Sequence, residues 1–253
     1  MDIELYYNNY INNWKDIWLN RFTFKGLDGR QIFASSNLAK FLKLQNNNYI
    51  FNNALDYREW AKKTAKDYTK WFYTINTSEK QADDYDAKLY NFCIGVLGEF
   101  FYITLLSSQK RIVIKKSIIT IDYITPLYDI PDRGVDFVCK ISFNGNTRTS
   151  VGQIKFWNPY NKSAIFDSKS LMGAIGQGYL EDILQQTEGH EKECLLCWLG
   201  EEKSISSYIK DYPKGNKALI GIDKKILADQ FDNFNANLFY NNILSATFNK
   251  LLI

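Results

Sequence analysis

The sequence predicts an α/β fold with a mainly helical amino-terminal region. Three observations lead to this prediction: helical spacing of apolar residues before residue 108, an Asn-Gly pair between two strand-like segments, and two late apolar runs, CLLCWL and ALIGI. Asn-Gly is the preferred two-residue loop of a β-hairpin, and short apolar runs are typical of buried strands. Helices and strands therefore alternate through the second part of the chain, as in an α/β protein.

The amino-terminal region is expected to extend over residues 1–85. Helical spacing predicts helices over 10–21, 36–44 and 56–73, the second of them starting at a serine that can cap it. The polar segment TSEKQADD, residues 77–84, is the best candidate for a boundary. This gives an amino-terminal region of 1–85 and a second domain of 86–253.

The second domain opens with the longest helical pattern. Apolar residues form one stripe along residues 86–108, and Glu99 interrupts this apolar segment. One or two strands are expected within 111–124, a hairpin over 136–157, a helix within 167–187, and strands in CLLCWL and ALIGI before a largely helical end.

Composition excludes several classes of protein. With 253 residues, 45% apolar and 23% charged, the chain resembles a soluble globular protein, and its amino terminus lacks the basic and apolar stretches of a signal peptide. We therefore expect a cytoplasmic protein without a membrane partner. The single histidine, His190, excludes chemistry that needs two. Cys194 and Cys197 have no second Cys or His pair, which argues against a zinc site.

Charge is segregated along the chain. Residues 105–162 contain nine basic and four acidic side chains, whereas residues 181–202 contain seven acidic side chains and one lysine. Such segregation can create a basic face suited to a polyanion, although a solvated surface without a partner is an equally good interpretation.

The hairpin carries the polar residues of interest. If the loop is 144–145, Asp136 lies directly opposite Gln153; if it is 145–146, Asp136 lies opposite Lys155. Because residues two apart on a strand share a face, either loop puts the three side chains on one face. The opposite face is apolar enough to pack on a helix.

A carboxylate, an amide oxygen and an ammonium group in one place can bind Mg²⁺ and a phosphate. Glu99 is a natural fourth member, because an unpaired carboxylate inside a packed helix would be costly. In a purely structural alternative, Asp136 and Lys155 form an ion pair at a strand end and Glu99 lies at the helix surface.

These residues resemble a known family. The segments GEFF, PDRGVDFV and GQIKFW are similar to the core signature of the PD-(D/E)XK, or restriction-endonuclease-like, nuclease superfamily, in its Gln-x-Lys variant close to Mrr-type restriction endonucleases. The resemblance covers roughly residues 89–200 and implies an αβββαβ core. The motif is short, and Gln153 stands where most members have an acidic residue, which removes one negative charge from the site.

The resemblance also implies roles for single residues. Asp136 would be the main ligand of Mg²⁺, Gln153 a weaker ligand, Glu99 a supporting ligand and Lys155 the catalytic lysine. Asp132, which follows Pro131, matches the letters PD of the family motif. It lies four residues before Asp136, however, and on an extended chain it would be out of reach of Lys155. Gln177 would follow the hairpin on a helix, near the scissile phosphate or simply at the surface.

The resemblance implies a Mg²⁺-dependent endonuclease that hydrolyses double-stranded DNA, as a type II-like restriction or phage-defence enzyme. A homodimer is expected if both strands of a symmetric site are cut. Region 1–85 would supply recognition through asparagines and aromatic rings, although most of those rings are expected in the core. A non-catalytic nucleic-acid-binding protein with a degenerate nuclease fold and a nuclease acting on RNA are the alternatives.

Overall fold

The computed structural model of the chain describes residues 2–21, 23–25, 31–45, 49–76, 82–114, 117–128, 135–143, 145–156, 194–199, 219–222, 224–233 and 236–252. At some positions within these ranges, Gln153 and Lys155 among them, the description is limited to the main chain. The predicted helix within 167–187, together with Asp132, Gln177 and His190, lies outside the described residues.

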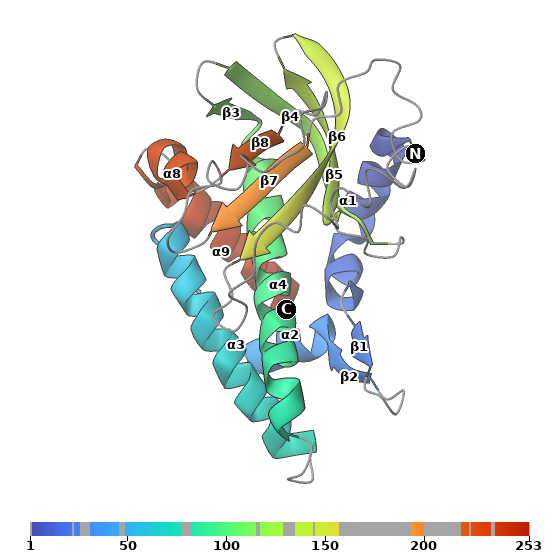
Figure 1. The fold of residues 1–253 in the computed structure, drawn as a ribbon, viewed down its shortest axis with the longest axis vertical. Helices are drawn as coiled ribbons and strands as arrows, with labels where there is room; N and C mark the ends of the chain where they lie inside the picture. Colours follow the sequence, from blue (N-terminus) through green and yellow to red (C-terminus); the bar gives the residue numbers. More distant parts are fainter. Residues whose placement is uncertain are drawn as a thin grey trace.

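The fold combines helices with a six-stranded sheet and thus confirms the α/β prediction at this level (Figure 1). The strands follow one another in sequence order, β3 to β8. Strands β3 to β6 are antiparallel, whereas β6, β7 and β8 are parallel. Their bounds are Arg111–Ile114 (β3), Ser117–Pro126 (β4), Phe137–Phe143 (β5), Asn146–Phe156 (β6), Cys194–Leu199 (β7) and Leu219–Ile222 (β8).

The amino-terminal region is mainly helical, as predicted, with helices α1 (Ile3–Asn20), α2 (Ser35–Leu44) and α3 (Ala54–Asn76). All three helices begin before their predicted positions, and polar side chains cap α1 and α3. Asp2 Oδ1 accepts hydrogen bonds from the main-chain N–H groups of Glu4 and Leu5, and Asn53 Oδ1 accepts one from Asp56 N. A short hairpin of β1 (Thr23–Lys25) and β2 (Gln31–Ala34) was not predicted.

Helix α4 (Ala82–Ser108) runs through the centre of the molecule, against strands β4 and β6 and beside α3 (Figure 1). It starts four residues before the predicted helix and includes the end of the predicted boundary segment. Residues Leu89–Ser108 are long and apolar enough to cross a membrane, but 83% of the most apolar window is buried inside the protein. Such burial is typical of the central helix of a soluble protein. The apolar character of Leu89–Ser108 is thus explained by its place in the core.

The carboxy-terminal segment is helical, as predicted. It contains α8 (Lys224–Leu227), the π-helical segments η2 (Ala228–Asp232) and η3 (Asn237–Leu244), and α9 (Ser245–Leu252). Phe248 of α9 contacts the rings of Tyr49, Trp60 and Phe100, so this segment closes the core over α3 and α4.

One hydrophobic core extends across the described part of the chain, from Tyr10 of α1 to Phe248 of α9. Most aromatic residues of the amino-terminal region lie in it, as expected, and buried rings such as Tyr57 and Tyr68 are not available for stacking on a base. Tyr57 also donates a 2.8 Å hydrogen bond to Leu97 O and so joins α3 to α4. Region 1–85 therefore shares its core with the rest of the protein, and a boundary near residue 85 stays a prediction.

The β5–β6 hairpin has the predicted register. Phe143 pairs with Asn146, so two residues connect the strands, and Gly145 has a φ of +84°, a value that suits glycine in such a turn. The pairing continues to Phe137 and Gly152 at the far end. This excludes the alternative loop over 145–146 and places Asp136 beside residues 152–154.

The outer edge of the sheet is covered by a side chain. Gln230 of η2 accepts a 2.9 Å hydrogen bond from Val113 N on β3 and donates a short one to Val113 O. The amide thus takes the place of a neighbouring strand at this position, which is one way in which proteins protect an edge.

Candidate functional site

Two carboxylates are buried among the side chains that the structure describes, Glu99 and Asp136, each with 7% exposure. Both were predicted as site residues from the sequence. Glu99 lies in the middle of α4, and Asp136 lies directly before β5. Since a buried carboxylate is costly unless it is paired, the contacts of these two groups are of interest.

Arg21, directly after α1, links the two residues. Its Nε and Nη2 atoms donate hydrogen bonds of 2.9 and 2.6 Å to Glu99 Oε2, and Nη2 also donates one of 3.0 Å to the carbonyl oxygen of Asp136. The ion pair is buried, with side-chain exposures of 8% for Arg21 and 9% for Glu99. The helix and the start of the hairpin are therefore joined through one guanidinium group.

Asp136 is bound to the opposite strand through both its main chain and its side chain. Its N–H donates to Gly152 O at 2.9 Å, and its Oδ2 accepts a 2.6 Å hydrogen bond from Ile154 N. Ile154 stands between Gln153 and Lys155 on β6. The carboxylate thus lies beside the segment that carries the other two predicted site residues, whose side chains are not described. A common face for all three side chains stays a prediction.

The position of Asp136 depends on a glycine. Phe137, the first residue of β5, pairs with Gly152, and a Cβ atom at Gly152 would lie 1.9 Å from the ring of Phe137. The ring is fully buried, so it has little room to move. Gly152 therefore permits the close approach of the two strands that brings Asp136 to Ile154.

The Cys197 thiol lies near Asp136 in the sheet. Burial raises the pKa of Cys197 on β7 well above its ordinary value, and the nearby Cys139 and Asp136 raise it further. Strand β7 has the bounds predicted for CLLCWL and Cys197 is buried in it, which supports a structural role for this cysteine.

The donor set fits Mg²⁺. Carboxylate oxygens are hard ligands, and Mg²⁺ in proteins usually takes one or two carboxylates and completes its shell with water and phosphate oxygens. Glu99 and Asp136 are carboxylates of this kind, with Glu99 Oε2 bound to Arg21 and Asp136 Oδ2 bound to Ile154 N, and Gln153 would add an amide oxygen. Among the described residues, no three His, Cys, Asp or Glu side chains are grouped closely enough to hold a metal ion by themselves. A site here would therefore depend on Gln153, water and substrate for the remaining ligands.

Sequence reasoning missed Arg21. The residue lies 78 positions before Glu99, outside the segment that resembles the nuclease core. Its signal was weak: a basic residue in the otherwise largely apolar stretch WLNRF, where a long charged side chain needs a buried partner.

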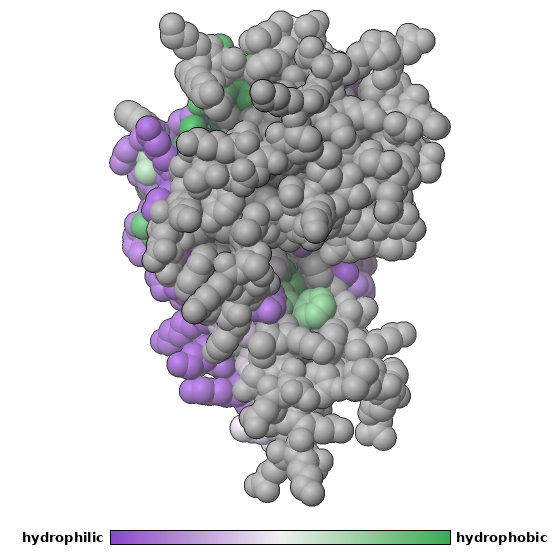
Figure 2. Space-filling view, in the orientation of Figure 1, coloured by the Kyte–Doolittle hydropathy of each residue, from purple (hydrophilic) through white to green (hydrophobic). Residues whose placement is uncertain are grey.

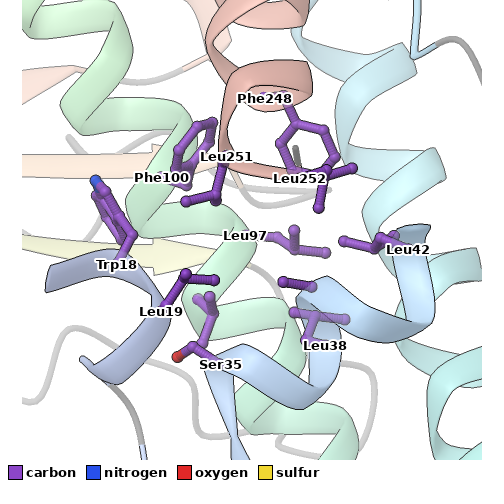
Figure 3. Close-up of a pocket in the computed structure, with 12 residues that line it drawn as sticks. Trp18, Leu19, Ser35, Leu38, Leu42, Leu97, Phe100, Phe248, Leu251 and Leu252 are labelled. Atoms are coloured by element: carbon purple, nitrogen blue, oxygen red, sulfur yellow. The ribbon is translucent and has the colours of Figure 1, made fainter. Parts of the chain in front are cut away.

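An apolar pocket lies next to this site (Figure 3). It is a shallow hollow lined by the end of α1, by α2, by the middle of α4 and by α9. Trp18 and Phe100, which neighbour Arg21 and Glu99 in sequence, line it and contact each other edge to face at 5.2 Å. Leu97, Leu251 and Leu252 point into it. Its lining is almost entirely apolar, so the pocket offers no ligand to an ion.

Comparison with known proteins gives no relative: no family model, no curated protein and no solved structure matches the chain.

Proposed function

We propose that the protein is a Mg²⁺-dependent endonuclease that hydrolyses DNA phosphodiester bonds, of the type II-like restriction or phage-defence kind. One observation carries this proposal. Glu99 and Asp136, the two buried carboxylates among the described side chains, lie on two separate elements that Arg21 joins, through the Glu99 carboxylate and the main-chain carbonyl of Asp136. The Asp136 carboxylate there accepts a hydrogen bond from Ile154, between Gln153 and Lys155.

The order of elements supports the proposal. The long helix α4 bears the glutamate, the four antiparallel strands β3, β4, β5 and β6 follow, and β7 lies parallel to β6. An αβββαβ core would use β4, β5 and β6 of these strands, with β3 as an addition at the edge of the sheet. The second helix of such a core would fall within 157–193, outside the described residues.

The proposed chemistry assigns a role to each residue. Asp136 and Glu99 would hold the cation, with Gln153 as a weaker neutral ligand. When bound, Mg²⁺ lowers the pKa of a coordinated water and neutralises charge on the phosphate. The Lys155 amine would position the attacking water and stabilise the charge that develops on the phosphate oxygens.

A basic stripe on α3 supports a polyanionic substrate. Lys63, Lys66 and Lys70 are exposed, share one face of the helix by their spacing, and form no salt bridge with any described residue. Figure 2 shows hydrophilic residues gathered along this side of the molecule. Replacing the three lysines by glutamine should weaken DNA binding and reduce the slope of log K against log salt by up to about 3.

Cleavage assays test the proposal directly. The full chain is incubated with plasmid DNA and with RNA, with Mg²⁺ or with EDTA. We expect DNA cleavage in Mg²⁺ alone and a loss of about 10³-fold or more in Asp136→Asn and Lys155→Ala. Lys140→Ala, which removes a cation over the ring of Tyr123 on β4, is the matched control. Cleavage by both site variants at the parent rate would overturn the proposal, and cleavage of RNA alone would change its substrate.

The ion pair favours a second candidate. Arg21 already neutralises Glu99, and Gln153 carries no charge, which is what a nuclease fold that has lost its metal would contain. Such a protein would bind nucleic acid without cutting it. Salt-sensitive binding without cleavage in Mg²⁺ or Mn²⁺ would favour this candidate.

A further inference from the structure

We propose that Arg21 is a built-in substitute for the metal: its guanidinium balances the buried Glu99 carboxylate when no divalent cation is bound, and a cation competes with it for this group. This inference rests on the proposed function, because it uses the same cation site. It adds a positioning residue from the amino-terminal region, which the nuclease resemblance does not cover.

The first step is the contact itself. Both Nε and Nη2 of Arg21 donate to one oxygen, Glu99 Oε2, at 2.9 and 2.6 Å. Mg²⁺ binds carboxylate oxygens at about 2.0–2.1 Å. A cation on Oε2 would lie close to the position that the guanidinium nitrogens take, and two positive charges at this separation repel each other strongly away from bulk water.

The second step is that α1 is held in place without Arg21. The rings of Tyr6 and Tyr128 stack with centroids 4.4 Å apart, Asn9 Nδ2 donates to the Tyr128 hydroxyl at 2.7 Å, and Trp18 packs against Phe100. None of these contacts uses the Arg21 guanidinium; Tyr6 and Asn9 lie before the kink of α1 at Asn13, and Trp18 lies after it, on the side of Arg21. We therefore expect the guanidinium to leave Glu99 while α1 stays docked.

The third step compares two opposing effects. A residue that only orients a metal ligand usually raises metal affinity by about 10- to 100-fold. Arg21 has the geometry of such a residue, but it also brings a full positive charge to the ligand oxygen. Since this charge lies in a buried place, its repulsion of the cation outweighs the benefit of orientation. Removing the charge should strengthen cation binding.

The test measures cation binding and folding, not cleavage. Mn²⁺ binding to the full-length parent and to Arg21→Gln is measured by electron paramagnetic resonance. Thermal unfolding of both proteins is measured once in the presence of EDTA and once in the presence of Mn²⁺. We expect Arg21→Gln to bind Mn²⁺ about tenfold or more tightly than the parent. In EDTA the variant should melt at a lower temperature than the parent, and Mn²⁺ should raise its melting temperature by more. Arg21→Lys, which keeps the charge, should stay close to the parent in Mn²⁺ affinity. In a protein that already carries Glu99→Gln, adding Arg21→Gln should change the Mn²⁺ affinity less than it does in the parent.

A measurement on the unaltered protein guards against a variant that does not fold. The ¹⁵N signal of the Arg21 Nε–H group, assigned by its loss in Arg21→Lys, should shift and exchange faster with water on addition of Mg²⁺. An unchanged signal at saturating Mg²⁺, or equal or weaker Mn²⁺ binding by Arg21→Gln, would overturn the inference even if the parent cuts DNA. Tighter Mn²⁺ binding by Arg21→Gln in a protein that cuts no nucleic acid would uphold the inference and refute the nuclease. Absence of Mn²⁺ binding in every form would refute both.

Discussion

Glu99 and Asp232 both join segments that are distant in sequence, but their charges are balanced in different ways. Glu99 accepts two hydrogen bonds from the charged Arg21. Asp232 accepts a 2.5 Å hydrogen bond from the Tyr240 hydroxyl and a 3.3 Å one from Ala54 N at the start of α3. The donors to the Asp232 carboxylate, which caps α3, are therefore neutral. A full charge buried against a full charge is a costlier arrangement, and such arrangements are candidates for function.

The largest effect is expected from breaking the charged pair. Glu99→Ala leaves the Arg21 guanidinium buried without its main acceptor and should lower the free energy of unfolding by about 3–5 kcal/mol. Chemical denaturation measures this loss. The double variant Arg21→Met/Glu99→Leu should recover most of it, because apolar residues of similar volume often replace a buried pair without loss. A double variant as unstable as the sum of its single changes would contradict the buried pair.

A smaller effect should follow from disturbing the strand that holds Asp136. Gly152→Ala places a methyl group against the buried ring of Phe137 and should cost about 1–3 kcal/mol of unfolding free energy. Gly95→Ala on α4 is the matched control, since nothing lies within 4 Å of its added Cβ and alanine favours a helix. Thermal unfolding of both variants decides the matter. Equal stability of the two would show that the approach at Gly152 is not close.

For Asp232, the second carboxylate compared above, Tyr240→Phe removes the hydroxyl group that donates a hydrogen bond to it. This change should cost about 1–2 kcal/mol, as for a hydrogen bond to a charged group. Tyr7→Phe, on a partly buried ring of α1, is the control and should stay within about 0.5 kcal/mol of the parent. A loss as large as that of Glu99→Ala would remove the distinction between the two carboxylates.

The smallest effect is a pH dependence at Asp232. Burial raises the pKa of this carboxyl above its ordinary value of 3.8, the charge of Asp56 raises it further, and the hydrogen bonds from Tyr240 and Ala54 partly offset the increase. The folded protein thus holds this proton more tightly than the unfolded chain. The resulting stabilisation is complete below pH 3.8 and is lost as the pH rises through the folded pKa.

Asp232→Asn removes this titration, because the amide keeps an oxygen acceptor but no ionisable proton. Denaturation curves at several pH values, from below 3.8 to neutral, should show the variant gaining stability relative to the parent as the pH rises. A difference that does not change with pH would mean that Asp232 is as well solvated in the folded protein as in the unfolded chain.

The two carboxylates also differ in how far they could be predicted. Glu99 was predicted because an acidic residue inside an apolar helix stands out at helical spacing. Asp136 was predicted because the Asn-Gly pair sets the loop length, and the loop sets the register of the hairpin. Asp232 gave no such signal, since an aspartate in a polar helical segment is ordinary.

Contacts between distant segments were not predictable from the sequence. The Arg21–Glu99 pair depends on how α1 docks on the sheet, which no local pattern specifies. The β1–β2 hairpin was missed because strands of three and four residues are too short for alternation to be recognised. Helix α3 was predicted, but its start depends on the Asn53 cap and on Asp232, which comes from the other end of the chain.

The amide of Gln230 has a consequence for assembly. It satisfies both main-chain groups of Val113, so a strand from another molecule could join β3 at this position only by first breaking two hydrogen bonds. Adding a strand to the sheet at β3 would thus first cost the two hydrogen bonds between Gln230 and Val113. If the protein forms the homodimer expected from its sequence, the two copies should meet elsewhere than at the β3 edge.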